Sequence, residues 1–175
     1  MKIIGFSYID GTCQMVLKGD SCLLVNRKPF FTPDWTNDVR VNRCVVLRVS
    51  RLGKGIAARF AGRYYDAIAE GLDFVAWDKL QEAREKGGSW TEAMCFDYSL
   101  AVGTWRDDER LEISDERLEI SDERLVVPIN EAIARVSNVM TIRQGDLIYI
   151  PYKDAAREVE RDEVIEGEGL YCKIK

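Results

Sequence analysis

The chain has 175 residues, of which 46% are hydrophobic and 31% charged, and its formal net charge is −5. These values predict a globular protein with one core, in a single domain that spans residues 1–175. The acidic balance argues against a nucleic-acid partner, because little positive charge is available to neutralise phosphates. No apolar stretch is long enough to cross a membrane and the opening MKIIGFSYID is unlike a signal peptide, so we expect a cytoplasmic protein without a membrane partner.

The histidine and cysteine content narrows the possible chemistry. The chain contains no histidine, which excludes Ser-His and Cys-His nucleophiles and zinc held by imidazole. It contains five cysteines, an odd number, and no Cys-x-x-Cys pair. We therefore expect unpaired, mostly buried thiols, as is usual in a reducing compartment.

Taken in chain order, short strand-like segments dominate the sequence. They are rich in Val, Ile, Leu, Phe and Tyr and are bounded by Gly, Pro, Asp or Asn. The predicted strands are KIIGFSYI (2–9), CLLVN (22–26), KPFFTP (28–33), VRVNRCVVLRVSRLG (39–53), GLDFVAW (71–77), RLVVPI (124–129), GDLIYIPY (145–152) and GLYCKIK (169–175).

Three segments favour helices. They are GIAARFAGRYYDAIA (55–69), which is rich in alanine, WDKLQEAREKGG (77–88), which ends at two glycines, and PINEAIARVSNVM (128–140), whose apolar residues recur at helical spacing. Together with the strands they predict an α+β fold that is rich in β-structure.

Residues 108–125 read DERLEISDERLEISDERL, a heptapeptide (LEISDER) given more than once. The apolar spacing does not fit the a and d positions of a coiled coil. The alternation Leu-Glu-Ile followed by the polar Ser-Asp-Glu favours a surface hairpin or an extended excursion, inserted in the domain. A dimer contact through this repeat is an open alternative.

One stretch of the chain, together with two shorter ones, resembles a known family. Residues 51–103 contain, in order, Gly53-Lys54, Gly71, Asp73, Ala76, Asp78, Trp90, Phe96 and Asp97. The segment MVLKGDSC places Lys18 in a second familiar stretch, and MTIRQGDLIYI forms a third near the C-terminus. In this order the chain resembles the fumarylacetoacetate hydrolase family, in particular its short bacterial single-domain members.

The resemblance implies a mixed β-sheet roll, a homodimer and a central site for Mg²⁺ or a similar cation such as Mn²⁺ or Ca²⁺. In the family, a Glu-x-Glu pair and an aspartate bind the metal, which holds a 2-oxo acid or β-diketone through hydrolysis, decarboxylation or isomerisation. Such a cation needs several carboxylate oxygens and acts as a Lewis acid on a developing enolate.

The metal-ligand positions are only partly kept in this sequence. Asp73 matches the family's aspartate, but the Glu-x-Glu pair falls on Asn42 and Cys44. One carboxylate in place of three predicts weak binding of a hard cation or none, and a thiol is a poor ligand for Mg²⁺. We therefore expect no cofactor, and Mg²⁺, Mn²⁺ or Ca²⁺ only if the protein is active.

Other positions that the resemblance marks as functional also differ. The family's catalytic lysine falls on Met94, and its substrate-carboxylate element falls on a stretch that includes Ile150 and Tyr152. These three residues are the expected lining of the substrate pocket. Lys18 is the residual candidate for a catalytic residue, because the family's histidine base is absent.

Asp73 lies in the apolar run LDFVAW, and two explanations stay open. It is either a vestigial metal ligand or a buried carboxylate that pairs with Lys18 or an arginine. The sequence thus favours a catalytically impaired relative that keeps a pocket for a small organic acid. The alternatives are an active metal-dependent enzyme with replacement ligands and a non-enzymatic interaction module that dimerises through the repeat.

Overall fold

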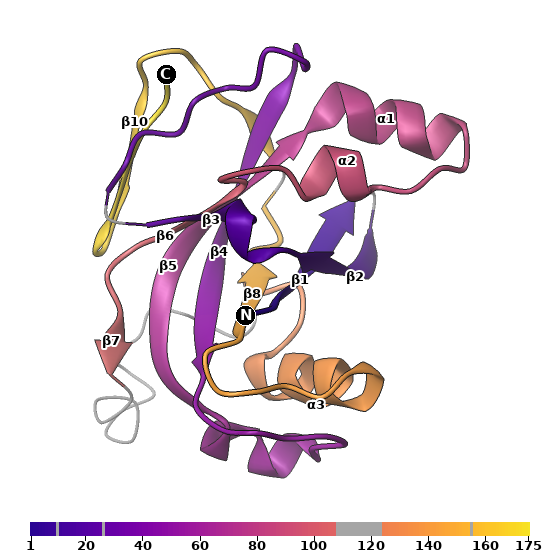
Figure 1. Cartoon of the computed structure of the whole chain (residues 1–175), viewed down its shortest axis with the longest axis vertical. Helices are drawn as coiled ribbons and strands as arrows, with labels where there is room; N and C mark the ends of the chain where they lie inside the picture. Colours follow the sequence, from indigo (N-terminus) through magenta and orange to yellow (C-terminus); the bar gives the residue numbers. More distant parts are fainter. Residues whose placement is uncertain (10, 26, 108–123, 155) are drawn as a thin grey trace.

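The computed structural model describes residues 1–9, 11–25, 27–107, 124–154 and 156–175 (Figure 1). Within these residues, nine strands form one curved sheet whose main path is β2-β1-β8-β4-β5-β6-β3, with β7 paired to β5 and β9 to β4. A separate hairpin is formed by β10 and β11. The strands are β1 (Ile3–Ile9), β2 (Thr12–Lys18), β3 (Leu23–Leu24), β4 (Val39–Val49), β5 (Tyr65–Ala76), β6 (Leu100–Val102), β7 (Arg106–Asp107), β8 (Leu147–Pro151), β9 (Arg157–Glu158), β10 (Val164–Gly167) and β11 (Leu170–Lys173).

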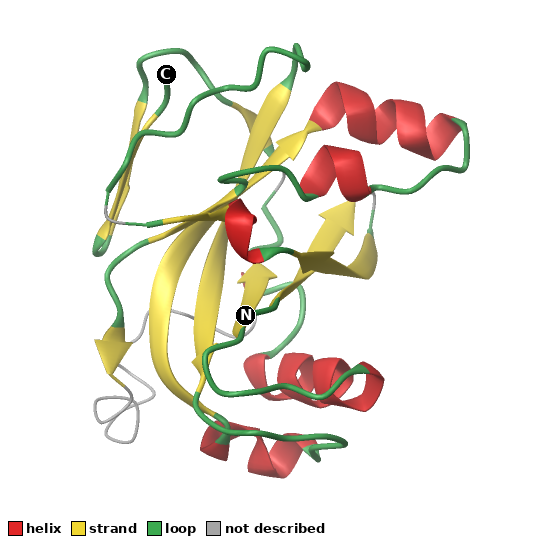
Figure 2. Ribbon diagram, in the orientation of Figure 1, coloured by secondary structure: helices red, strands yellow, loops and turns green. Residues whose placement is uncertain are grey.

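The sheet is mixed, since β1 pairs with β8 and β3 with β6 in parallel while the other pairs are antiparallel. The helices are few and short, and they lie around the curved sheet (Figure 2). They are η1 (Asp20–Cys22), η2 (Ala58–Arg63), α1 (Trp77–Glu85), α2 (Thr91–Met94) and α3 (Ile129–Val139), of which η1 and η2 are 3₁₀-helices. The predicted fold class, a β-rich α+β fold with a mixed sheet, is therefore confirmed.

The long antiparallel pair β4–β5 forms the centre of the sheet and is buried on both faces. Side chains alternate along each strand, so residues two apart share a face. From β4, Val45 and Leu47 join a core cluster under α3, whereas Cys44 and Val46 join a second cluster on the other face. A strand buried on both faces has apolar residues at successive positions, as Cys44, Val45, Val46 and Leu47 do in β4.

The helix predicted over 55–69 is wrong for most of its length. Only η2 is helical, and β5 begins at Tyr65. The alanines that suggested a helix, Ala67 and Ala69, pair with Arg48 and Val46 of β4 in the sheet. Long-range strand pairing has overridden local helix propensity here. The helices predicted over 77–88 and 128–140 are confirmed as α1 and α3.

Two predicted strands shrink to single bridges. Phe30 alone pairs with Ile174 in the segment 28–33, and Leu125 alone pairs with Tyr152 in the segment 124–129. A hairpin was predicted for the repeat over 108–125. Residues 108–123 of this segment lie outside the described residues. No helix in the described part of the chain is long and apolar enough to cross a membrane.

Candidate functional site

The structure brings together the three positions that match the family's metal ligands. Asn42 on β4 lies directly opposite Asp73 on β5, and Cys44 lies opposite Gly71. Because side chains alternate along a strand, Asn42, Cys44 and Asp73 share one face of the sheet. Directly opposite residues have Cβ atoms about 5 Å apart, which is close enough for two side chains to contact the same ligand.

A lysine ammonium lies at this point. The Nζ atom of Lys18 lies 2.8 Å from Oδ1 of Asp73, and neither side chain has any exposed surface. Lys18 is the last residue of β2. In the sheet, β2 is followed by β1, β8, β4 and β5, and this strand order brings the ammonium to Asp73 on β5. Two opposite charges buried together in this way satisfy each other electrostatically.

Ser99 provides the other contacts of the ammonium. Lys18 donates hydrogen bonds from Nζ to the Ser99 carbonyl oxygen at 3.2 Å and to the Ser99 Oγ atom at 2.9 Å. The Ser99 hydroxyl in turn donates to the carbonyl oxygen of Met94 at 3.2 Å. An ammonium has three protons, and three oxygen atoms, Oδ1 of Asp73 and two of Ser99, lie close to it. The catalytic role of Lys18 stays a prediction.

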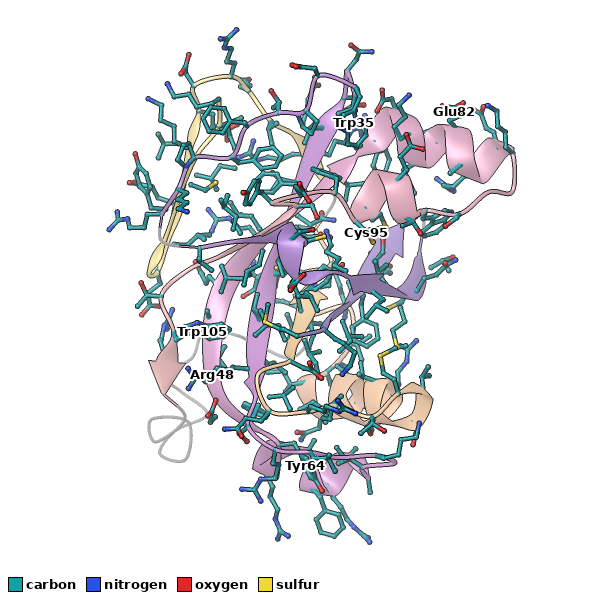
Figure 3. The ribbon with its side chains drawn as sticks, viewed as in Figure 1. Trp35, Arg48, Tyr64, Glu82, Cys95 and Trp105 are labelled. Atoms are coloured by element: carbon teal, nitrogen blue, oxygen red, sulfur yellow. The ribbon has the colours of Figure 1, made fainter. Side chains whose placement is uncertain are left out.

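The ion pair is enclosed by bulky side chains. Lys18 Nζ lies 5.6 Å from the centre of the Tyr149 ring, and Tyr149 is fully buried. This ring occupies the space that a side chain at position 5 would need, because a Cβ atom built on Gly5 would lie 1.9 Å from it. Cys95, at the end of α2, donates from Sγ to the Leu17 carbonyl oxygen at 3.0 Å and ties α2 to β2 (Figure 3).

Burial dominates the electrostatics of this cluster. It raises the pKa of the Asp73 carboxyl, although the charge and hydrogen-bonding of Lys18 act in the opposite direction. Burial also raises the pKa of Cys44 and that of Tyr149 well above their usual values, and the Asp73 charge adds to both shifts. Burial therefore favours the neutral thiol form of Cys44 in this structure.

The donor set does not fit a divalent metal ion. Across the described residues, no group of three or more Cys, Asp or Glu side chains is placed to hold one. Of the acidic residues that could replace the lost ligands, Glu70 lies an odd number of positions from Asp73 and so faces the other side of β5. Asp78 accepts a hydrogen bond from the Thr36 hydroxyl, and Glu92 and Asp97 are exposed. One carboxylate beside an ammonium, with an amide and a neutral thiol, gives no net negative charge to hold such an ion.

The three residues expected to line a substrate pocket do not come together. Met94 is fully buried in a cluster with Leu80. Ile150 is fully buried in another cluster, on the α3 side of the sheet. Only Tyr152 lines a described cavity. Met94, at the position of the family's lysine, and Ile150, in its carboxylate-binding element, thus both pack in the core here.

The structure adds two residues to the site that the sequence did not reveal. Ser99 stands in an ordinary polar stretch, and only the pairing of β5 with β6 brings it to Lys18. Tyr149 belongs to an apolar strand, β8, where nothing marks it from its neighbours. Local sequence cannot reveal a contact partner from a distant strand, because the order of strands in the sheet decides which residues meet.

Comparison with solved structures identifies the fold. No family model matches the chain, and a search of curated proteins returned no match. Among solved structures, a fumarylpyruvate hydrolase from Pseudomonas aeruginosa in complex with Mn²⁺ and pyruvate has a TM-score of 0.84 at 19% identity, covering 99% of this chain and 88% of that one.

Two further solved structures share this fold. A 5-carboxymethyl-2-hydroxymuconate delta-isomerase from Mycobacterium smegmatis has a TM-score of 0.75 at 17% identity and covers 99% of this chain and 78% of its own. A yeast fumarylacetoacetate hydrolase family protein has a TM-score of 0.72 at 16% identity, with 91% and 82% covered. The chain therefore has the fold of the fumarylacetoacetate hydrolase family.

Proposed function

We propose that this chain is a relative of the fumarylacetoacetate hydrolases that has lost two of the three metal-binding carboxylates and whose remaining aspartate is paired with a buried lysine, so that the metal-dependent reaction is lost. The observation that supports this most is the fully buried contact between Lys18 and Asp73. A positive charge already neutralises the one carboxylate that would attract a cation.

The other two ligand positions support the same conclusion. Asn42 offers a neutral amide oxygen, and Cys44 is a buried thiol whose pKa is raised. Neither adds negative charge. A divalent ion entering here would have to displace the Lys18 ammonium from Asp73. The displaced ammonium would then be buried without a partner.

The hydrolase or decarboxylase with replacement ligands is the competing hypothesis. It needs Glu70, Asp78, Glu92 or Asp97 to reach Asp73. Glu70 points to the other face of β5, and Asp78 already accepts a hydrogen bond from Thr36, so neither is free to reach Asp73. In the described residues, no group of acidic side chains is placed to hold a metal ion.

A turnover assay tests the proposal. The purified protein is incubated with oxaloacetate and with an acylpyruvate, with Mg²⁺, Mn²⁺ or EDTA. We expect rates that do not exceed those of the Asp73→Asn variant or of buffer with the same metal. Metal-dependent turnover that the Asp73→Asn variant lacks, while that variant keeps its circular dichroism spectrum, would refute the proposal.

We further propose that the protein is a cytoplasmic homodimer. Phe31, Trp35 and Tyr98 are exposed aromatic side chains, a residue type enriched at protein interfaces. Light scattering measures the mass directly. A dimer that becomes a monomer when one LEISDER unit is deleted would favour the repeat as the interface, and a dimer unaffected by the deletion would exclude it.

A further inference from the structure

One end of the molecule carries positive charge that nearby residues in the sequence do not balance. Residues 39–65 contain seven arginines or lysines and no aspartate or glutamate, although the whole chain has a net charge of −5. This stretch comprises β4, the loop after it and η2, and η2 lies with α3 at the lower end of the structure in Figure 1. The molecule is therefore divided into a basic part and a strongly acidic remainder.

Backbone contacts gather the cations of this end on one surface. The Ser50 N–H donates to the Tyr64 carbonyl oxygen at 2.9 Å, which joins the loop after β4 to the end of η2. Gly53 pairs with Ile142, which brings the same loop to the segment after α3. The resulting basic surface consists of five exposed side chains, those of Arg51, Lys54, Arg59, Arg63 and Arg143.

The cations of the basic surface lack acidic partners. Within the described residues, none of the five forms an ion pair. Lys54 donates from Nζ to the carbonyl oxygen of Asn138 at 3.0 Å. The Cζ atoms of Arg59 and Arg63 lie 4.8 and 5.2 Å from the ring centre of Phe60. All five positive charges therefore remain available to a partner.

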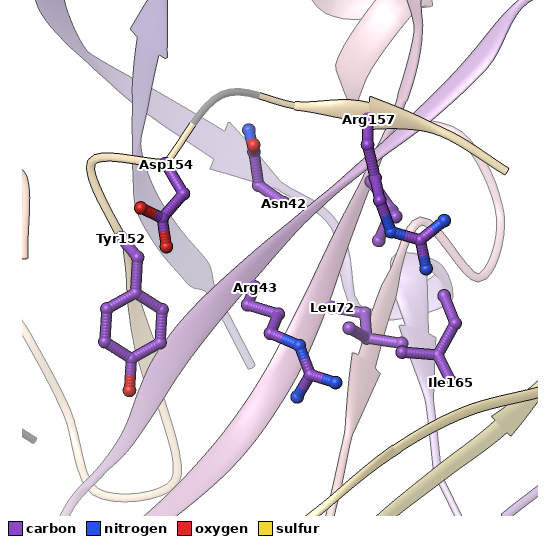
Figure 4. A pocket seen from close by; sticks show the side chains of 8 residues that line it. Asn42, Arg43, Leu72, Tyr152, Asp154, Arg157 and Ile165 are labelled. Carbon is purple, nitrogen blue, oxygen red and sulfur yellow. The ribbon is translucent and has the colours of Figure 1, made fainter. Parts of the chain in front are cut away.

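Two arginines elsewhere show a different arrangement. The Nη1 atom of Arg43 lies 3.8 Å from Oε2 of Glu70, and Arg157 pairs with Glu163. Both arginines line a cavity of about 180 Å³ beside β4, which Figure 4 shows. Unpaired cations held together at one end of a protein repel one another, and a negatively charged partner relieves this repulsion.

Exposed apolar side chains accompany these cations. Leu52 is 69% exposed, Val139 64% and Phe60 40%. Leu52 and Val139 are among the three most exposed large hydrophobic residues of the described structure. A nucleic acid would match the cations but would leave the aliphatic side chains uncovered. The surface instead fits a polypeptide that carries carboxylates and aliphatic side chains together.

The chain itself contains such a sequence in the LEISDER repeat. Residues 108–123 include eight aspartates or glutamates, two arginines and four leucines or isoleucines. The repeat follows directly after β7, whose last residue, Asp107, pairs with Ala67, four positions beyond Arg63. The repeat thus has the charge and the apolar residues that the basic surface lacks, and the chain enters it near the end of η2.

We infer that the basic surface of one protomer binds the acidic repeat of a second copy of this chain. The inference rests on the proposed homodimer and names its interface. With a two-fold axis, each protomer gives its repeat and receives that of its partner, so both contacts form together and the assembly closes as a dimer. A stable interface uses about 20–30 residues on each side. The sixteen residues of the repeat and the eight exposed side chains described above reach this size.

Light scattering over a range of protein concentrations tests the inference through the strength of the dimer. We expect Arg59→Gln/Arg63→Gln to raise the dissociation constant of the dimer about tenfold or more. Lys28→Gln/Arg161→Gln removes the same charge from exposed positions outside the basic surface and should change it by less than about twofold. Raising the salt from about 0.05 to about 0.5 M should also weaken the dimer, because exposed charges are screened. Circular dichroism confirms that each variant is folded.

A free peptide identifies the ligand of the basic surface. The peptide LEISDERLEISDER should convert dimers into monomers, whereas the same peptide with Asn and Gln in place of Asp and Glu should not. An acidic peptide without effect, or a dimer that the two variant pairs weaken equally, would overturn the inference.

The remaining outcomes separate the inference from the proposed homodimer. A dimer that withstands deletion of one LEISDER unit would overturn the inference and leave the homodimer standing, whereas a monomer at every concentration would overturn both. Sedimentation with phosphatidylglycerol vesicles that Arg59→Gln/Arg63→Gln abolishes, with a dimer of equal strength in all variants, would assign the surface to lipid and also overturn the inference.

Discussion

The ammonium of Lys18 lies 2.8 Å from the carboxylate of Asp73, and both side chains are completely buried. The two residues come from β2 and β5, which are separated in the sheet by three other strands. Their contact therefore depends on the curvature of the whole sheet and on Ser99, which fixes the ammonium with two hydrogen bonds.

Removing the ammonium alone should be costly. Lys18→Met leaves the Asp73 carboxylate buried without its counter-charge, which we expect to lower the free energy of unfolding by about 3–5 kcal/mol at pH 7. The double variant Lys18→Met/Asp73→Asn removes both charges and should recover much of that loss. Urea denaturation measures both, and a double variant no more stable than the single one would contradict a mutually dependent pair.

The same pair predicts a pH dependence of definite sign. Burial raises the pKa of Asp73 above its value in the unfolded chain. The folded form therefore holds the proton more tightly, and the stability this contributes is lost as the pH rises through the raised pKa. The penalty of Lys18→Met should thus shrink on acidification towards about pH 4. A penalty that stays constant between pH 7 and pH 4 would contradict this.

Asp146 should show the opposite dependence. Its carboxylate accepts hydrogen bonds from the backbone N–H groups of Lys2 and Arg143, at 2.8 and 2.9 Å, and pairs with the Lys2 ammonium at 2.6 Å. Burial raises its pKa, but these contacts outweigh that effect and lower it. Its contribution is present above the unfolded pKa of about 3.9 and lost as the pH falls further.

We therefore expect Asp146→Asn to cost about 1–3 kcal/mol at pH 7 and progressively less below pH 4. Denaturation at a series of pH values measures the difference from the unsubstituted protein. The exposed Asp20 provides the control, since Asp20→Asn should have little effect at any pH. A cost for Asp146→Asn that persists at low pH would show that the carboxylate acts by packing alone.

The Tyr149 hydroxyl should be dispensable. It is buried and has no hydrogen-bond partner in the described structure. Tyr149→Phe keeps the ring that packs on Lys18 and removes the unpaired hydroxyl, so we expect a stability within about 1 kcal/mol of the original or above it. A larger loss would mean that the hydroxyl is bonded in solution.

A gain of metal binding should follow from restoring charge. Asn42→Asp places a second carboxylate directly opposite Asp73, and Lys18→Met removes the competing ammonium. We expect the double variant to bind Mn²⁺ with a dissociation constant on the order of 1 mM or below, and Asn42→Asp alone to bind none at that concentration. Equal binding by the two would show that Lys18 does not compete with the metal.

The fold was predictable from sequence where the signal is local. A segment rich in Val and Leu marked β4, and the apolar spacing and flanking residues marked α1 and α3. The alanines of β5 suggested a helix, and the prediction was wrong because pairing with β4, which is remote in sequence, decides their conformation. Register sets which residue faces which, and it follows from the turn geometry and the buried pattern of the whole sheet.

Part of the candidate site could be reached from the sequence. The family resemblance pointed to Asn42, Cys44 and Asp73, which the structure brings together, and a pairing of Asp73 with Lys18 was one of two explanations left open. The sequence gave no sign of Ser99 or Tyr149. Their positions depend on the pairing of β6 and β8, which meet the site only in the folded sheet.

The measurement that bears most directly on the central claim is a titration of the unsubstituted protein with Mn²⁺, followed by electron paramagnetic resonance. With Lys18 as the cation beside Asp73, all the Mn²⁺ should stay in its free aqueous form up to about 1 mM, the weak end of protein sites for hard cations. Uptake of one Mn²⁺ per chain at micromolar concentration, abolished by Asp73→Asn, would contradict the account and show that a metal displaces the lysine.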